Sequence, residues 1–193
     1  ASSFRSAGQR CSALRCLYVQ EDIAPHLIAM IKGAMDELRV GDPQSLATDV
    51  GPVIDAEAQD GIEAYTDANA ARILHRVWAP KQGHFIAPVL LKVGGIKDMD
   101  REVFGPVLHV ATFRADQLDR VIADINARGY GLTFGLHTRI DSRVQEVTEA
   151  IHAGNIYVNR NQIGAVVGSQ PFGGEGLSGT GPKAGGPLYL ARF

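Results

Sequence analysis

The alternation of strand-like and helix-like apolar patterns constrains the fold of this chain more than any other feature. Short apolar runs that are typical of strands occupy 14–19, 73–78, 85–93, 106–113, 132–138 and 155–159. Apolar residues at helical spacing predict helices over 21–38, 55–71, 116–128 and from 141 to the break at 154. Strands that alternate with helices form right-handed βαβ units. We therefore predict an α/β fold, a three-layer domain whose mostly parallel sheet carries helices on both faces.

Three local features refine this prediction. Asp55 and Asp141 precede helical patterns and are expected to cap those helices. Pro88 lies inside the run 85–93, which predicts an edge position or an irregularity there, because proline cannot donate to a strand ladder. From residue 160 to 187 the periodicity disappears and glycine and proline become frequent. A long irregular segment in a compact domain is typically functional or disordered, and the aromatic and apolar residues of this one favour function.

Composition excludes several classes of function. The chain has 193 residues, of which 45% are hydrophobic, so one sizeable core and one domain are expected. A net charge of −2 without clustered lysine and arginine argues against nucleic-acid binding. No apolar run approaches the ~20 residues of a membrane helix, and no signal segment is evident, so a soluble protein without a membrane segment is expected. The six histidines show no metal-ligand spacing, so no metal site is expected. Two cysteines are too few for a disulfide framework, which favours the reducing cytoplasm.

Cys11 is the candidate nucleophile. The glycine at position 8 permits a sharp turn that keeps the thiol out of a helix interior, and Arg10 favours the thiolate. The alternative is that Cys11 is a small buried apolar residue, which is the common role of a free cysteine. Cys16 lies within the apolar run 14–19, where packing is its expected role.

Two further patterns have competing interpretations. Residues 174–179 form a G-x-G-x-x-G sequence, but a dinucleotide site requires a strand before it and a helix after it, and here proline and glycine flank it on both sides. We interpret this stretch as a tightly turning loop beside a substrate. Glu102 alone would be a solvated carboxylate at a helix end. Its position between a polar segment and a strand places it near strand ends and their loops, where sheet enzymes collect ligands.

The pattern Phe4-x-x-x-Gly8-Gln9-x-Cys11 resembles the cysteine motif of the aldehyde dehydrogenase superfamily. Two more motifs, at 102–106 (EVFGP) and 171–174 (PFGG), follow in the order of that family. Ser12, the run 164–170 and the stretch 185–190 are similar to the L-glutamate γ-semialdehyde (Δ1-pyrroline-5-carboxylate) dehydrogenases. Within that group the chain most resembles the carboxy-terminal dehydrogenase part of the bifunctional proline-utilization enzymes, over essentially all of its length.

This resemblance implies the fold of the catalytic, cysteine-bearing domain and a role for each matched residue. Cys11 is the nucleophile that attacks the aldehyde. Glu102 binds the ribose at the nicotinamide end of NAD, and Phe104 packs near the nicotinamide. The hydroxyl of Ser12 and the backbone amides of Gly164 and Ala165 hold the carboxylate of the substrate, and the side chain of Phe172 packs on its aliphatic chain.

The resemblance also implies that residues 1–193 are one part of a longer polypeptide. The NAD-binding domain, the general-base glutamate, an oxyanion asparagine and the hairpin that joins subunits lie upstream in the family, and residues 160–187 anchor the substrate. The parent protein is expected to be a homo-oligomer, with FAD only if it also carries a proline dehydrogenase half. The alternative is a natural short protein that keeps the fold as a binding or assembly module without dehydrogenase activity.

Overall fold

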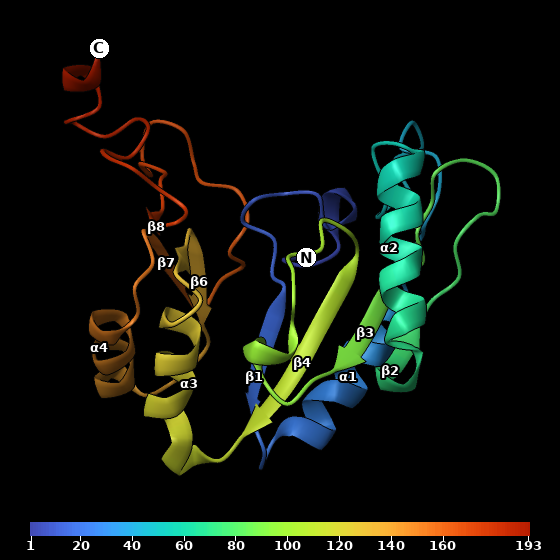
Figure 1. Ribbon diagram of the computed structural model, residues 1–193, viewed down its shortest axis with the longest axis horizontal. Coiled ribbons are helices and arrows are strands. Elements are labelled where there is room, and N and C mark those ends of the chain that lie inside the picture. Colours follow the sequence, from blue (N-terminus) through green and yellow to red (C-terminus); the bar gives the residue numbers. More distant parts are fainter. The chain divides into compact units, whose positions relative to one another are not determined.

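The computed structural model describes residues 1–193, which form two compact units, 1–118 and 119–193 (Figure 1). The first unit contains a 3₁₀ turn followed by the main strands and helices, in the order η1 (Arg5–Gly8), β1 (Cys16–Gln20), α1 (Ala24–Asp36), α2 (Ala56–Ala68), β2 (Ile73–Arg76), β3 (Val89–Lys92) and β4 (Val107–Phe113). Three further 3₁₀ turns connect them, η2 (Ala70–Arg72), η3 (Ile96–Asp98) and η4 (Ala115–Gln117).

The sheet of the first unit has the strand order β1-β4-β3-β2. β4 pairs in parallel with both β1 and β3, whereas β2 pairs antiparallel with β3. The sheet is therefore mixed and mostly parallel, which confirms the predicted fold class. β1 and β4 are parallel neighbours, with Cys16 opposite His109. The segments that lead into these two strands therefore meet at the same end of the sheet, where both strands begin.

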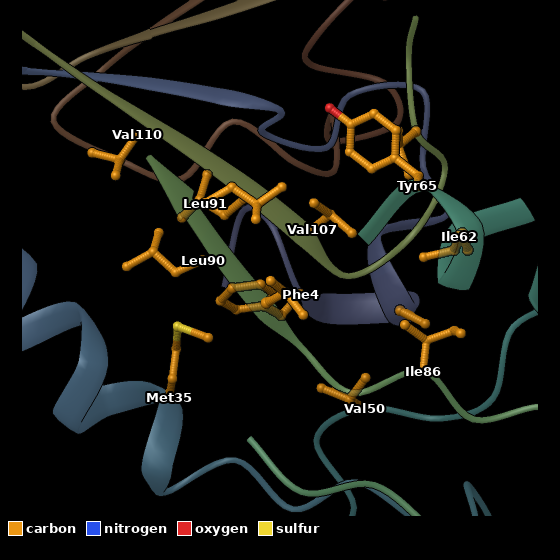
Figure 2. Close-up of a cluster of buried hydrophobic side chains, with 14 of the residues drawn as sticks. Phe4, Met35, Val50, Ile62, Tyr65, Ile86, Leu90, Leu91, Val107 and Val110 are labelled. Atoms are coloured by element: carbon orange, nitrogen blue, oxygen red, sulfur yellow. The ribbon is translucent and has the colours of Figure 1, made fainter. Parts of the chain in front are cut away.

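Both faces of this sheet are covered. Residues 89–91 of β3 and 107–111 of β4 are buried at consecutive positions, although successive side chains of a strand point to opposite faces. Met35 of α1 and Ile62 and Tyr65 of α2 belong to the same apolar cluster as these strands (Figure 2). The apolar stripes of the two predicted helices thus provide the core.

The proline expectation in β3 is only partly right. Pro88 is fully buried and lies just before β3, where its carbonyl accepts a hydrogen bond from Val77 N at 3.1 Å. β3 has partners on both sides, so the predicted edge position is wrong. An irregularity does exist, but it lies on β2 as a register shift between Ile73 and His75.

The helix boundaries follow local chemistry. Asp55 caps α2 as predicted, since its carboxylate accepts a hydrogen bond from Ala58 N at 2.8 Å. α1 begins three residues later than predicted because Pro25 occupies its first turn. Asp141 is the first helical residue of α4 and does not cap it, which corrects the prediction. Ile140 takes the N-cap position without a side-chain bond, and the charge of Asp141 still favours the helix amino terminus.

The second unit consists of short elements and a long irregular segment, with α3 (Leu118–Asn126) at its start, then β5 (Tyr130–Gly131), β6 (Thr133–Leu136), α4 (Asp141–Ala150), β7 (Asn155–Val158), β8 (Glu175–Gly176) and η5 (Leu190–Arg192). β6 and β7 pair in parallel across α4, which is a βαβ unit as predicted. None of the helices combines the length and the apolar composition of a membrane span.

The glycine-rich stretch 174–179 contains the two-residue strand β8 and a turn, and no α-helix follows it. A Cβ atom at Gly179 would lie 1.8 Å from the carbonyl oxygen of Gly174, and one at Gly154 would lie 1.9 Å from that of Gly173. Glycine is needed at these positions because two backbone segments touch. The strand and helix that a dinucleotide fingerprint requires do not flank this stretch.

Candidate active site

The loop that carries Cys11, residues 4–12 and hereafter the cysteine loop, is shaped by three consecutive left-handed residues. Ser6, Ala7 and Gly8 have φ values of 54°, 51° and 67°. A Cβ atom at Gly8 would lie 2.0 Å from the carbonyl oxygen of Gly105. Gly8 therefore needs glycine for its dihedral angle and for space. The cysteine loop lies directly against residues 102–106, hereafter the glutamate segment.

The two cysteines occupy different environments. Cys11 is exposed, which excludes its interpretation as a buried packing residue. Cys16 opens β1, and desolvation, helped by the charge of Asp98, raises the pKa of its thiol to about 12. Only a thiolate attacks a carbonyl carbon, so Cys16 is inert near neutral pH. Of the two thiols, Cys11 is the one that is exposed to solvent.

Arg15 connects the cysteine loop with the glutamate segment, and sequence reasoning missed it. Its Nη1 and Nη2 donate to the carbonyl oxygens of Gly8 and Arg10 at 2.5 and 3.0 Å. Its Nε donates to Oε1 of Glu102 at 3.1 Å, and its guanidinium lies 4.5 Å from the ring centroid of Phe104. The available signal was a cation within the apolar run 14–19.

Glu102 and Phe104 are both partly exposed beside this arginine. The Glu102 side chain is 42% exposed, compared with 12% for that of Arg15, and Phe104 is 47% exposed. Burial lowers the pKa of the Arg15 guanidinium, while the hydrogen bond and charge of Glu102 oppose that shift. The cysteine loop precedes β1 and the glutamate segment precedes β4, so both lie at the amino ends of these strands. The general rule for open α/β sheets would instead place ligands at the carboxyl ends.

Gln9 belongs to the cysteine motif, but sequence reasoning missed its structural role. Its Oε1 accepts a hydrogen bond from Ile54 N at 2.8 Å, and its Nε2 donates to the carbonyl oxygen of Pro52 at 3.3 Å. These bonds tie the middle of the cysteine loop to the loop that precedes α2. The signal was an amide side chain that can donate and accept, placed between the turn glycine and the cysteine.

The residues predicted to hold a carboxylate belong to different units. Ser12 is buried in the first unit, immediately after Cys11. Gly164, in the second unit, has a left-handed φ of 76°, and no backbone carbonyl accepts a hydrogen bond from its N–H or from that of Ala165. Gln170 stabilises the turn that follows, since its Oε1 accepts from Val166 N at 2.9 Å.

Phe172 lies in a short turn, residues 171–173 and hereafter the phenylalanine turn. Asn155, which is buried at the start of β7, donates to the carbonyl oxygen of Pro171 and accepts from Gly173 N, both at 3.0 Å. The backbone of Phe172 exchanges two hydrogen bonds with that of Ala184, at 3.0 and 2.9 Å. Asn155 therefore holds both ends of the phenylalanine turn, a role that no local pattern indicated.

Comparison with known proteins covers the whole chain. The model of the "Aldehyde dehydrogenase family" matches residues 1–193. The "Bifunctional protein PutA" of Klebsiella aerogenes is 53% identical over 205 residues, which span 100% of this chain and 16% of that protein. The "1-pyrroline-5-carboxylate dehydrogenase" of Bacillus cereus is 38% identical, over 99% of this chain and 38% of that protein.

Solved structures show the same relationship. A variant of Proline Utilization A (PutA) from Bradyrhizobium japonicum superposes with a TM-score of 0.96 at 54% identity, over 99% of this chain and 20% of that one. A 1-pyrroline-5-carboxylate dehydrogenase from Thermus with bound NAD gives a TM-score of 0.89 at 31% identity, over 100% of this chain and 38% of that one. The chain thus spans only a fraction of the proteins it matches. Motifs, fold and relatives agree, and the chain belongs to the aldehyde dehydrogenase family.

Proposed function

We propose that this chain is the catalytic, cysteine-bearing part of an NAD-dependent dehydrogenase that oxidises L-glutamate γ-semialdehyde to L-glutamate in proline catabolism. One observation carries the proposal: the loop with exposed Cys11 lies against the segment that bears Glu102 and Phe104. The substrate is supported by relatives named PutA and 1-pyrroline-5-carboxylate dehydrogenase.

Glu102 and Phe104 fit the nicotinamide end of NAD. Arg15 occupies Oε1 of Glu102, which leaves the second carboxylate oxygen to accept from ribose hydroxyls. The half-exposed ring of Phe104 offers an apolar face to a nicotinamide. When bound, NAD supplies the hydride acceptor for the reaction.

Cys11 performs the covalent chemistry. Its thiolate attacks the aldehyde carbon, and the C–S bond converts the carbonyl to a thiohemiacetal whose oxyanion the Cys11 backbone N–H stabilises. Loss of a hydride from that carbon leaves a thioester on Cys11. Water then cleaves the C–S bond, which releases glutamate, returns the thiolate and completes the conversion of one aldehyde, one NAD and one water to one acid, one NADH and one proton.

Carboxylate recognition is assigned to small groups. The N–H groups of Gly164 and Ala165 donate to no backbone carbonyl and are suited to an anion, and the family resemblance adds the hydroxyl of Ser12. Phe172, fixed in the phenylalanine turn, would cover the aliphatic part of the substrate. Each charge-assisted hydrogen bond is worth about 1.5–3 kcal/mol, or roughly ten- to a hundredfold in kcat/KM.

We further propose that residues 1–193 are the catalytic domain of a longer cytoplasmic, homo-oligomeric protein, with residues 160–187 as the substrate-anchoring region. The upstream part would supply the NAD-binding domain, the general base and an oxyanion asparagine, and FAD would bind only if a proline dehydrogenase half is present. The relatives carry the names of enzymes and give no support to a binding or assembly module without dehydrogenase activity.

The test compares the full-length protein with the 193 residues alone, using NADH formation from glutamate semialdehyde. The full-length protein should turn over and lose activity in Cys11→Ala, and the isolated chain should stay below detection. A missing oxyanion donor costs about 10²- to 10³-fold and a missing general base about 10²- to 10⁴-fold.

A second variant tests the substrate class. Ser12→Ala should lower kcat/KM of the full-length protein by roughly ten- to a hundredfold for glutamate semialdehyde and leave a neutral aldehyde of equal length nearly unchanged. Equal losses on both substrates would refute carboxylate anchoring by Ser12. Robust turnover by the isolated chain would show that it contains its own base and cofactor site.

A further inference from the structure

We propose that Arg15 is a positioning residue that holds the nucleophile loop and the cofactor-binding side chains in one fixed arrangement. The inference rests on the proposed function, because it assigns Arg15 to the site that contains Cys11, Glu102 and Phe104. None of the motifs that carry the family resemblance includes this arginine.

The contacts of Arg15 use the whole guanidinium. Nη1 and Nη2 donate to the carbonyl oxygens of Gly8 and Arg10, on either side of Gln9, and Nε donates to Glu102, which is 87 positions away in the sequence. A planar group with donors at three nitrogens can serve three acceptors in different directions, whereas a lysine ammonium is a single point charge. One side chain thus joins two segments that no local hydrogen bond could align.

The same side chain fixes the orientation of both cofactor-facing groups. Arg15 is mostly buried, so its charge needs compensation, and Glu102 provides it by turning Oε1 inward. The phenyl ring of Phe104 lies under the guanidinium at 4.5 Å, a cation–π distance that holds the ring in place while half of the residue stays exposed. Without Arg15, both Glu102 and Phe104 would gain rotational freedom.

The backbone of Arg15 is anchored independently of its side chain. The Arg15 carbonyl oxygen accepts a hydrogen bond from the backbone N–H of His109 at 3.0 Å, and it lies 2.9 Å from Nδ1 of the same histidine, within hydrogen-bond distance. On the other side of the ring, His109 Nε2 lies 2.8 Å from the hydroxyl of Tyr65. These bonds belong to the junction of β1 and β4. A substitution that removes only the guanidinium therefore leaves the sheet paired and isolates the positioning role.

The experiment uses the full-length enzyme with Arg15→Met, Arg15→Lys, Glu102→Gln and the double variant Arg15→Met/Glu102→Gln. The matched control is Arg114→Met, which removes a guanidinium from an exposed pair with Asp116 away from the site. The measurements are KM for NAD, kcat, and hydrogen exchange of the cysteine-loop amides by mass spectrometry. The amide of Gln9 in the loop donates to the Ser6 carbonyl at 3.0 Å, and that of Ala13 directly after the loop donates to the Arg10 carbonyl at 3.1 Å, so both report on the loop.

Arg15→Met should raise KM for NAD at least about tenfold and speed exchange of the loop amides at least about tenfold, since charge-assisted bonds to both segments are lost. Glu102→Gln should raise KM for NAD while exchange stays at the wild-type rate. The double variant should match Arg15→Met in KM, because both act through one carboxylate. Arg15→Lys should recover part of each loss, and Arg114→Met should behave as wild type.

Two results would overturn the inference. One is wild-type exchange of the loop amides in folded Arg15→Met, and the other is KM effects of Arg15→Met and Glu102→Gln that simply add. The proposed function is judged separately by NADH formation in the wild type. If the wild type fails to turn over, the exchange measurement still decides whether Arg15 holds the loop. Normal turnover with unchanged exchange would reject Arg15 and leave the dehydrogenase assignment standing.

Discussion

The contrast between the two cysteines yields a quantitative prediction about alkylation. In a Cys11→Ser variant, the only remaining thiol is Cys16, whose pKa burial raises to about 12. At pH 7.5 a thiol with that pKa is ionised to a fraction of roughly 3 × 10⁻⁵, compared with about 10% for an unperturbed thiol of pKa ~8.5. Iodoacetamide should therefore modify Cys16 about 3,000 times more slowly in the folded variant than in guanidinium.

The assay is a quenched time course with peptide mapping by mass spectrometry. The Cys16→Ser variant is the matched control, because its exposed Cys11 should be modified readily in the folded state. The folded Cys11→Ser variant should also react about tenfold faster for each unit of pH up to pH 10, as the thiolate fraction rises. Modification of folded Cys16 within tenfold of the unfolded rate would refute the argument from burial.

Three further predictions follow from the packing. Gly8→Ala should lower the free energy of unfolding in urea by at least about 3 kcal/mol, because the alanine would be strained at a left-handed φ and would clash with the Gly105 carbonyl. Gly33→Ala in α1 is the control, since open space surrounds that glycine, and it should be neutral or stabilising by up to about 1 kcal/mol. Because the pKa of Cys16 is raised in the folded state, the unfolded state loses the thiol proton at lower pH. The free energy of unfolding should therefore fall as pH rises from 9 towards 12, and be about 2 kcal/mol lower at pH 10.5 than at pH 9. A Cys16→Ala variant should lack this part of the pH dependence. Asn155→Ala should release the phenylalanine turn and lower kcat/KM of the full-length enzyme for glutamate semialdehyde by about tenfold or more, and an unchanged value would remove Asn155 from the positioning of that turn.

Local periodicity was sufficient to predict the class of fold. The helical spacing in 55–71 and the cap at Asp55 are properties of neighbouring residues, and the structure confirms both. The edge position expected from Pro88 was wrong because a proline weakens only a ladder in which its nitrogen would take part, and β3 starts one residue after Pro88. A shift of one position is below what an apolar run can specify.

The arrangement of the site could be predicted only in part. Cys11 and Glu102 were recognised from their motifs, but their adjacency depends on the strand order β1-β4, which no local pattern encodes. Arg15 was missed because its importance lies in backbone carbonyls and in a carboxylate far away in the sequence. Side chains that hold others in place leave little trace in a linear pattern.

The close contact between Gly8 and Gly105 has a consequence for the order of folding. Cys11 is synthesised well before the surface on which its loop rests, because that surface is nearly a hundred positions further along the chain. The contact is non-local and has a high entropic cost, because the loop can pack on this surface only when β4 has paired with β1. A nascent chain that ends before residue 105 therefore carries Cys11 without the backbone against which its loop packs. The geometry proposed for catalysis is a late property of the assembled sheet.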